Sequence, residues 1–241
     1  MNENKTFTHG YFNEDCIAGM KRFPDKYFDL AIVDPPYFAQ ANLKYGFAKP
    51  ISTTGQARKD YHISTSWEIP TQEYYDELCR VSKNQIIWGI NYFEFVGVPH
   101  GRIVWDKQKA MQGYYSDAEI ASCSLLKHVR TFRYTWDGMR QGDMKNKEDK
   151  IHITQKPVAL YMWLLNTYAK PGDKILDTHV GSASSLIACH RLGFEYVGFE
   201  LDPHYYKISR ERLDAEKSQV NIVDIIEKKT GEQLELLGGD T

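Results

Sequence analysis

Short apolar strands alternate with helices along this chain, and that alternation restricts it to a small set of folds. The region from residue 157 to residue 213 shows it best, with strands predicted at 174–177 and 196–199 and helices at 157–169, 182–192 and 203–213. Parallel neighbours in a sheet need a crossover connection, which is usually a helix. The pattern therefore predicts an α/β fold whose mostly parallel, twisted sheet carries helices on both faces.

The N-terminal part of the chain contributes further strands. Residues 28–33 (FDLAIV) are short, apolar and β-branched in part, as in a buried parallel strand, and Pro35-Pro36 ends this run. Thr71 is expected to cap a helix that continues through Val81. Further strands are predicted at 85–90, 102–105, 118–125 and 131–136.

The length of 241 residues, with 42% of them apolar, suits a single domain over residues 1–241. Residues 40–66 show no clear periodicity, and 137–151 are polar and expected to be loop. We therefore expect short insertions at 40–66 and 107–151, where long loops commonly serve a function. Residues 218–241 form a polar C-terminal tail.

Composition excludes several classes of protein. The longest apolar run is the eight residues Val158–Leu165, whereas a membrane span needs about 20. The N-terminus has no apolar stretch behind a basic start, so no secretory signal is expected. Four widely spaced cysteines and eight unclustered histidines predict neither a disulfide framework nor a metal site, and they fit the cytoplasm. Because the net charge is −2, binding to nucleic acid would depend on local basic patches.

Residues suited to ligand binding follow two of the predicted strands. Strand 174–177 ends in Asp177, and Gly181 lets the following backbone pass close to a ligand. Glu200 follows the next strand, where a carboxylate would accept hydrogen bonds from a ribose diol. The pattern indicates a nucleoside-containing ligand, although a glycine with a downstream acid also occurs in ordinary strand–helix turns. The three-glycine fingerprint of nicotinamide and flavin sites is absent.

Lys156 lies at the expected start of a helix, because Pro157 is typical of a first helical turn. A cation at this positive end of the helix dipole is unfavourable by ~0.3–1 kcal/mol. Lys156 is therefore either a solvated lysine or, together with the helix terminus, faces a bound carboxylate.

The tetrapeptide Asp34-Pro35-Pro36-Tyr37 directly follows the strand at 28–33. Its prolines fix φ and lack N–H groups, so the backbone carbonyls are rigid and have few local donors. Asp34 and the Pro35 carbonyl could each accept an N–H from an exocyclic amine while the Tyr37 ring stacks on the base. Such acceptors keep electron density on nitrogen during alkylation and so stabilise the transition state. The alternative is a strand-terminating turn with a caged aspartate.

Taken together, these segments resemble the amino-methyltransferases of DNA, in the permuted group whose catalytic motif precedes the cofactor motif. His152–Pro157 (HITQKP) is similar to the family's HPTQKP segment, and residues 176–184 (LDTHVGSAS) are similar to its S-adenosylmethionine loop. Three further similarities are to the ribose-binding strand end at 198–202, to the adenine-contacting segment at 13–16 (NEDC), and to the segments flanking the target base at 104–107 and 115–119. The chain departs from the family at Ile153, where proline is usual, and at Ala183 and Ser184, which replace a glycine and a threonine.

The resemblance implies a Rossmann-like fold and a small stand-alone bacterial or phage enzyme that methylates double-stranded DNA with S-adenosylmethionine. It implies that Glu200 holds the ribose hydroxyls, that Asp15 and Cys16 receive the adenine, and that Lys156 faces the methionine carboxylate. The other cofactor-binding candidates are Asp34, Asp177, Thr178, His179, Gly181, Ser182, Ser184, Leu201 and Asp202. The catalytic candidates are Asp34, Pro35, Pro36 and Tyr37, and no metal is implied.

Contacts to DNA are expected from basic residues in the two insertions. These are Lys44, Lys49, Arg58 and Lys59 in the first, and Lys107, Arg130, Arg133 and Arg140 in the second. Phe132, Tyr134 and Trp136 interleave with the second set, and they either support stacking on bases or, as alternating strand aromatics, belong to the core. Insertions this short predict a short recognition sequence or help from a second subunit, as in a homodimer.

Adenine N6 is the preferred target, because an aspartate at the start of the tetrapeptide resembles adenine-modifying members, whereas serine is common in cytosine-N4 enzymes. Cytosine-N4 methylation stays an alternative, as does an RNA or protein-glutamine amine. From another class, the chain is alternatively a catalytically degenerate DNA-binding module, and more distantly a nicotinamide oxidoreductase. The sequence does not predict the recognition site or whether a partner nuclease of a restriction-modification pair exists.

Overall fold

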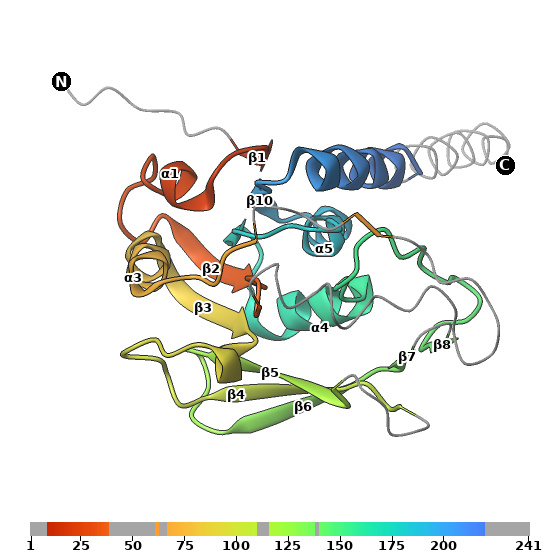
Figure 1. The fold of residues 1–241 in the computed structure, drawn as a ribbon, viewed down its shortest axis with the longest axis horizontal. Coiled ribbons are helices and arrows are strands. Elements are labelled where there is room, and N and C mark those ends of the chain that lie inside the picture. The colour runs from red at the N-terminus through yellow and green to blue at the C-terminus, as the bar shows by residue number, and fades with distance from the viewer. Residues whose placement is uncertain (1–8, 39–60, 63–66, 110–115, 138–139, 220–241) are drawn as a thin grey trace, which may run out of the picture.

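An eight-stranded mixed sheet, in the order β1-β10-β9-β2-β3-β5-β4-β6, forms the centre of the protein (Figure 1). The structure is a computed structural model that describes residues 9–38, 61–62, 67–109, 116–137 and 140–219. The strands are β1 (Gly10–Phe12), β2 (Phe28–Val33), β3 (Ser82–Trp88), β4 (Arg102–Asp106), β5 (Ala118–Cys123), β6 (Val129–Arg133), β9 (Lys174–Asp177) and β10 (Glu195–Phe199). Among these eight strands β5 alone runs against its neighbours, which confirms the mostly parallel sheet.

Helices cover both faces of the sheet, as the sequence predicts. In Figure 1, α1 (Cys16–Met20) and α3 (Gln72–Val81) lie to the left of the sheet, whereas α4 (Val158–Tyr168), α5 (Ser184–Leu192) and the C-terminal helix, residues 203–219, lie to the right. Neighbouring residues of a strand point to opposite faces. Leu30 and Ile32 of β2 therefore join the apolar cluster of α4 and α5, while Ala31 and Val33 join that of α1 and α3.

Capping residues fix several of the helix ends. Asp202 Oδ1 accepts hydrogen bonds from the N–H groups of His204 and Tyr205, at 2.8 and 3.1 Å, and so begins the C-terminal helix as predicted. Gly193 ends α5 with φ +73°, which glycine adopts without strain. Thr71 occupies the N-cap of α3 but makes no side-chain capping bond.

Several predicted boundaries differ from the structure. Strand β3 spans 82–88 instead of 85–90, because Gly89 turns the chain into the 3₁₀ helix η1 (Ile90–Tyr92). The strand predicted at 131–136 is divided into β6 and β7 (Trp136–Asp137), and β7 pairs with β8 (Arg140–Gln141) inside the expected loop.

Differences also occur at the two ends of the described chain. β1 and α1 were not predicted, because they are only three and five residues long. The last helix continues to residue 219 instead of ending near Leu213, so the predicted tail at 218–241 begins inside this helix and otherwise lies outside the described residues. No helix in the described part of the chain has the length and apolar character needed to cross a membrane.

The packing of α4 against the sheet contributes to stability. Leu164 of α4 is fully buried in the cluster that joins α4 and α5 to the sheet. Leu164→Ala removes apolar contacts and leaves a cavity, so we expect the free energy of unfolding to fall by about 2–5 kcal/mol in urea denaturation. The matched control is Leu125→Ala, at a site 43% exposed, which should change it by less than about 0.5 kcal/mol. Equal losses in the two variants would contradict the packing described here.

Candidate functional site

The carboxyl ends of β2 and β9 lie next to each other in the middle of the sheet. The two strands are parallel neighbours, with Ala31 opposite Leu176. The chain continues from β2 to β3 on one side and from β9 to β10 on the other, so the strand order reverses at this point. Such a switch point leaves a crevice beyond the strand ends, where ligands bind in open α/β sheets. The tetrapeptide at 34–37 and the loop that begins at Asp177 therefore meet at one edge of the sheet.

Asp34 belongs to a network of four side chains, which also includes Tyr37, Glu119 and Lys156. The Lys156 ammonium lies 2.5 Å from Asp34 Oδ2 and 2.8 Å from Glu119 Oε2. It also donates to the Tyr37 hydroxyl oxygen at 2.9 Å. The Tyr37 hydroxyl in turn donates to Asp34 Oδ1 at 2.5 Å and lies 3.2 Å from Glu119 Oε2. Residues from three distant parts of the sequence thus form one polar cluster, which we call the Asp34 network.

Lys156 is 3% exposed, so the interpretation of this residue as a solvated lysine is wrong. Its side chain extends from the segment before α4 into the Asp34 network and lies 5.7 Å from the centre of the Trp88 ring. Its ammonium contacts two carboxyl groups of the chain itself, which offsets the cost of burying a cation.

Glu119 also belongs to the site, although the sequence indicated it only as part of the segment 115–119. It lies on β5 in register with Trp105, and it shares a strand face with Ala121 and Cys123 of the core. The alternation of Glu119 with these buried residues along β5 was the sequence pattern that could have placed its side chain inside the protein. The second Glu119 oxygen binds the Lys107 ammonium at 2.6 Å, and the Lys107 side chain is only 14% exposed. Lys107, a predicted DNA contact, therefore lies beside the Asp34 network and not on the open surface.

Burial and neighbouring charges shift the pKa values of this network in opposite directions. Burial raises the pKa of Asp34, and the Lys156 ammonium only partly opposes that rise. Burial alone would also raise the pKa of Glu119, but Lys156 and Lys107 together bring it down to about 2. Burial disfavours the Lys156 ammonium, yet the two carboxylates outweigh it and its pKa ends above the ordinary value. Glu119 is therefore ionised near neutral pH, and the Lys156 ammonium lies between the Glu119 and Asp34 carboxyl groups.

The Tyr37 ring is held by aromatic side chains and by the backbone of Gly89. It stacks on Tyr92 with ring centres 5.1 Å apart and meets Phe93 edge-on at 6.1 Å. Gly89 has φ +69°, and a Cβ atom there would lie 2.0 Å from Tyr37 Cε1. Glycine is required here for both its conformation and its size. Tyr92 and Phe38 are 40% and 42% exposed, so aromatic faces reach the surface beside Asp34.

Asp177 at the end of β9 organises the start of the following loop. Its Oδ1 accepts a hydrogen bond from His179 N at 3.0 Å, and its Oδ2 accepts one from the Ser185 hydroxyl of α5. Burial raises the pKa of Asp177 to about 7, although these hydrogen bonds oppose the rise. The Thr178 hydroxyl lies 2.6 Å from the Tyr74 hydroxyl of α3, which ties the loop to the opposite face of the sheet.

Glu200 connects the ends of β9 and β10. Its Oε2 accepts from Gly181 N at 2.8 Å, and its Oε1 accepts from Asp202 N at 2.9 Å. Burial raises the pKa of Glu200 to about 7, and the two backbone donors oppose that rise. Each carboxylate oxygen has a second lone pair, so Glu200 can still accept hydrogen bonds from a ligand. Leu201, next along the chain, is 46% exposed at the same edge.

Residues 13–16 lie against this edge, as the resemblance implies. The Asn13 side-chain amide donates to the Glu200 carbonyl at 2.7 Å. Asp15 caps α1 by accepting from Ala18 N at 2.8 Å, and Cys16 is packed against the cluster of α1 and α3. The predicted adenine-contacting and ribose-binding residues are therefore neighbours.

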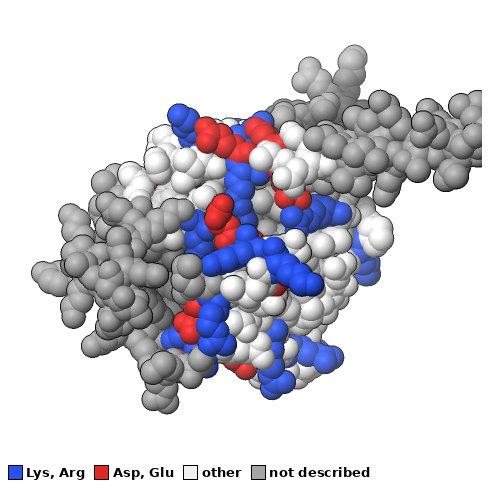
Figure 2. Space-filling view, turned by 90° about the vertical axis from the view of Figure 1, so that its right-hand side faces the viewer, with Lys and Arg blue, Asp and Glu red and all other residues white. Residues whose placement is uncertain are grey.

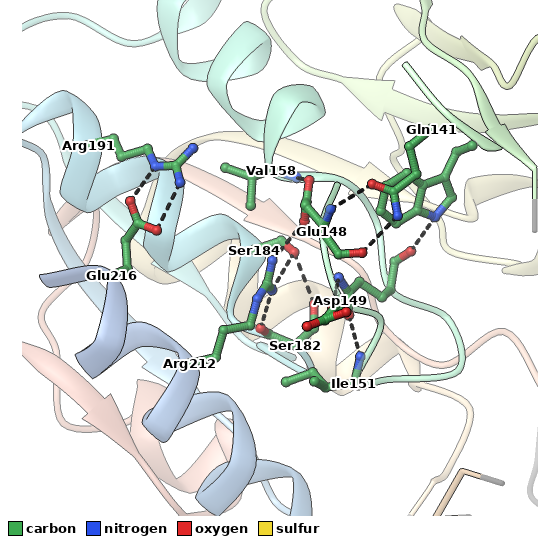
Figure 3. Close-up of polar contacts among 12 residues, drawn as sticks. Gln141, Glu148, Asp149, Ile151, Val158, Ser182, Ser184, Arg191, Arg212 and Glu216 are labelled. Carbon is green, nitrogen blue, oxygen red and sulfur yellow. Dashed lines mark hydrogen bonds and ion pairs between the residues drawn. The ribbon is translucent and has the colours of Figure 1, made fainter. Parts of the chain in front are cut away.

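The loop between β9 and α5 contains two residues in the left-handed region. Gly181 has φ +55° and Ala183 has φ +62°. That conformation costs a residue such as alanine about 1–2 kcal/mol. Arg212 of the C-terminal helix donates to this loop and to Glu148 (Figure 3). The sequence analysis did not identify Arg212, although its spacing from the buried Tyr205 and Ser209 places it on the inner side of the helix.

The predicted DNA contacts fall into three groups. Lys44, Lys49, Arg58 and Lys59 lie outside the described residues, and Lys107 is in the site. Arg130, Arg133 and Arg140 are exposed on β6 and β8. Figure 2 shows the face that carries the β7–β8 ribbon, where Lys and Arg side chains form a band with Asp and Glu among them.

The interleaved aromatic residues pack within the protein. Phe132 stacks on Trp163 of α4 with ring centres 5.0 Å apart, and Trp136 is buried. Their interpretation as packing residues therefore holds over that of a base-stacking surface. Within the described residues no cluster of histidine, cysteine and acidic side chains is suited to hold a metal ion.

Comparisons with known proteins give a consistent result. The N6/N4 methyltransferase family, described as DNA methylase, matches residues 57–211. The type II methyltransferase M.HpaI of Haemophilus parainfluenzae is 35% identical over 251 residues, covering 87% of this chain and 76% of that protein. The crystal structure of an M1.HpyAVI–SAM complex has a TM-score of 0.52 at 18% identity, covering 84% of this chain and 98% of that one. The cytosine-N4-specific PvuII DNA methyltransferase has a TM-score of 0.54 at 13% identity, with coverages of 89% and 93%.

The Asp34 network should make stability depend on Lys156 in a pH-dependent way. Lys156→Met removes the cation that Asp34 and Glu119 share and leaves only Lys107 beside Glu119, so we expect the free energy of unfolding near pH 8 to fall by about 3–5 kcal/mol. In the native protein the Glu119 pKa of about 2 lies below its ordinary 4.5, so that stabilisation is present above 4.5 and is lost as the pH falls towards 2. In the variant, burial and repulsion raise the carboxyl pKa values, and proton uptake restores stability as the pH falls.

Urea denaturation of both proteins between about pH 5 and pH 8 measures this deficit, which should be smaller at the lower pH. Lys83→Met is the matched control, because Lys83 is 54% exposed and pairs with Asp29 at the surface. It should cost less than about 1 kcal/mol at every pH. A Lys156→Met deficit that grew towards pH 5 would rule out the proposed charge balance.

Proposed function

The chain belongs to the N6/N4 DNA methylase family, and we propose that it transfers a methyl group from S-adenosylmethionine to the exocyclic N6 of adenine in double-stranded DNA. The observation that carries the proposal is the parallel pairing of β2 with β9. This pairing brings an amine-recognising tetrapeptide and a nucleoside-binding edge to the same switch point of the sheet. The motif order, with 34–37 before 177–184, supports membership of the permuted group.

The residues at the β9 and β10 ends fit S-adenosylmethionine by their chemistry. Glu200 retains acceptor capacity for a ribose diol, and Asp15 and Cys16 lie next to it for the adenine. Asp34 and Asp177 bring carboxyl groups to the same edge, where the cationic sulfonium and ammonium groups of the cofactor would favour their ionised forms. The cofactor would supply the electrophilic methyl carbon. We assign Thr178, His179, Gly181, Ser182, Ser184, Leu201 and Asp202 to the surrounding wall. We do not assign Lys156 to the methionine carboxylate, because its three N–H groups already bind Asp34, Glu119 and Tyr37.

Asp34 would orient the target amine and stabilise its developing charge. Its two oxygens already accept bonds from Tyr37 and Lys156, but a carboxylate has about four acceptor positions. Asp34 and the Pro35 carbonyl can therefore accept the two N–H groups of the amine. These acceptors hold the nitrogen lone pair towards the methyl donor and favour the cationic transition state. Pro36 keeps the turn rigid, and Tyr37 offers an aromatic face for the base.

A base inside a duplex cannot reach Asp34, so the target nucleotide would leave the stack at a cost of a few kcal/mol. The exposed rings of Phe38 and Tyr92 beside Tyr37 provide apolar surface for a base outside the helix. Arg130, Arg133 and Arg140 are proposed to contact phosphates, together with Lys44, Lys49, Arg58 and Lys59. Lys107, held by Glu119, is proposed to lie at the base pocket instead.

Asp34→Ala tests the catalytic assignment. Loss of the acceptor should reduce methyl transfer to DNA by about 10²–10³-fold or more, while the affinity for S-adenosylmethionine changes only a few-fold. The comparison variant is Glu200→Ala, in which the main expected effect is a lower affinity for S-adenosylmethionine. Methyl incorporation and isothermal titration calorimetry measure the two effects separately. Native turnover in Asp34→Ala would remove this residue from the mechanism.

Digestion of methylated DNA to nucleosides and identification of the product tests the choice of base. We expect N6-methyladenine, because an aspartate begins the tetrapeptide. N4-methylcytosine would overturn the choice of adenine and leave the amine chemistry intact. Binding of S-adenosylmethionine with no methylated product on DNA of varied sequence would instead identify a degenerate DNA-binding module.

A further inference from the structure

We propose that Arg212 is a positioning residue that holds the loop Gly181–Ser184 in the shape required to bind the cofactor. This proposal rests on the function proposed above, which assigns that loop to the cofactor. Arg212 lies in the C-terminal helix, 30 residues after Ser182, and touches neither the Asp34 network nor Glu200 in any contact described here. Its effect would act through the backbone of the loop.

The Arg212 guanidinium contacts the loop on both sides of Ala183. One nitrogen, Nη1, donates to the Ser182 carbonyl at 2.6 Å and to the Ser184 hydroxyl at 3.0 Å. Ser182 and Ser184 are buried, so these bonds are shielded from water. Figure 3 shows the Arg212 side chain extending from its helix to both serines.

Ala183 explains why the loop needs such an anchor. Its φ of +62° is a conformation that side chains other than glycine rarely adopt. Ala183 is completely buried, and its N–H donates to the Val180 carbonyl at 3.0 Å, so the chain cannot simply relax into another conformation without breaking this contact. Bonds to the residues immediately before and after Ala183 hold the strained conformation in place.

Glu148 extends this anchor to the segment that carries Lys156. The second guanidinium nitrogen of Arg212 donates to Glu148 Oε2 at 2.7 Å. Glu148 Oε1 accepts from Val158 N at 2.9 Å, at the first residue of α4 and two residues after Lys156. The Gln141 side chain fixes Glu148 in turn, because it both donates to the Glu148 carbonyl and accepts from Glu148 N at 2.8 Å. Arg212 thus links the cofactor loop to the segment of chain that carries Lys156.

An ion pair between α5 and the C-terminal helix provides a matched control. Arg191 of α5 binds Glu216 of the C-terminal helix through two bonds, at 2.6 and 2.8 Å (Figure 3). The Arg191 side chain is 43% exposed, whereas that of Arg212 is 18% exposed. Arg191 docks the helix but makes no contact with the loop 181–184 in the described structure. If Arg212 only held the C-terminal helix in place, substitution of either arginine should have the same effect on cofactor binding.

The test compares Arg212→Lys with Arg191→Lys in the full chain. Lysine keeps the charge opposite Glu148 but cannot reproduce the planar fork that reaches three acceptors. We expect Arg212→Lys to weaken S-adenosylmethionine binding about 10- to 100-fold in calorimetry, because it loses bonds from a charged donor to the loop. Amide exchange at Gly181 and Ala183 in the ligand-free protein should accelerate in parallel. Arg191→Lys should leave both quantities within about twofold of the native protein.

Ala183→Gly separates positioning from general destabilisation. Glycine removes the strain at φ +62°, so adding it to Arg212→Lys should recover about tenfold in affinity and slow the exchange of the loop. Native affinity and exchange in Arg212→Lys, or losses that Ala183→Gly leaves unchanged, would overturn the proposal. If the native protein itself bound no S-adenosylmethionine, the proposed function would fail, while the exchange measurements would still decide whether Arg212 holds the loop.

Discussion

The parallel pairing of β2 with β9 is the constraint on which the rest of the site depends. It joins a strand near the N-terminus to one near the C-terminus, and the backbone N–H of Lys174 also donates to the Asp29 side chain across 145 residues of sequence. Without this pairing, the tetrapeptide after β2 and the loop after β9 would have no reason to share an edge. With it, the reversal of strand order opens a crevice at which both can act on one ligand.

The chemistry at this edge depends on how buried carboxylates are neutralised. Asp34 and Glu119 share one buried lysine, and Glu119 binds a second cation, so the anions near the target side are balanced by fixed charges. Asp177 and Glu200 accept hydrogen bonds from backbone and hydroxyl donors, and burial raises their pKa values to about 7. The two sides of the site therefore differ in kind. On one side a lysine contacts two carboxyl groups, and on the other side burial brings the carboxyl pKa values close to neutral pH.

Sequence alone predicted the layered fold, the tetrapeptide and the strand-end acids, because each is a local pattern. Strands 28–33 and 174–177 match the structure residue for residue. The first is a largely apolar run that Pro35-Pro36 ends, and the second has an apolar centre at Ile175-Leu176. The predicted bounds of β3 were wrong, because its first residues, 82–84, are mostly polar. The predicted length of the last helix was too short. Contacts between distant segments give Glu119, Gly89 and Arg212 their roles in the site. Strand register and helix docking, which set those contacts, are not written in any short window of sequence.

The position of β9 late in the chain has a consequence for how the protein is made. When residues 28–37 leave the ribosome, the partner strand that completes their edge has yet to be synthesised, and so has the helix that supports the loop beyond it. Until β9 has been made, β2 can pair only with β3, and its other edge stays unpaired. Closing contacts of such large sequence separation is slow. The crevice can therefore form only late in synthesis. A chain that ends before residue 174 has the tetrapeptide but lacks the loop after β9, and it exposes an unpaired edge of β2.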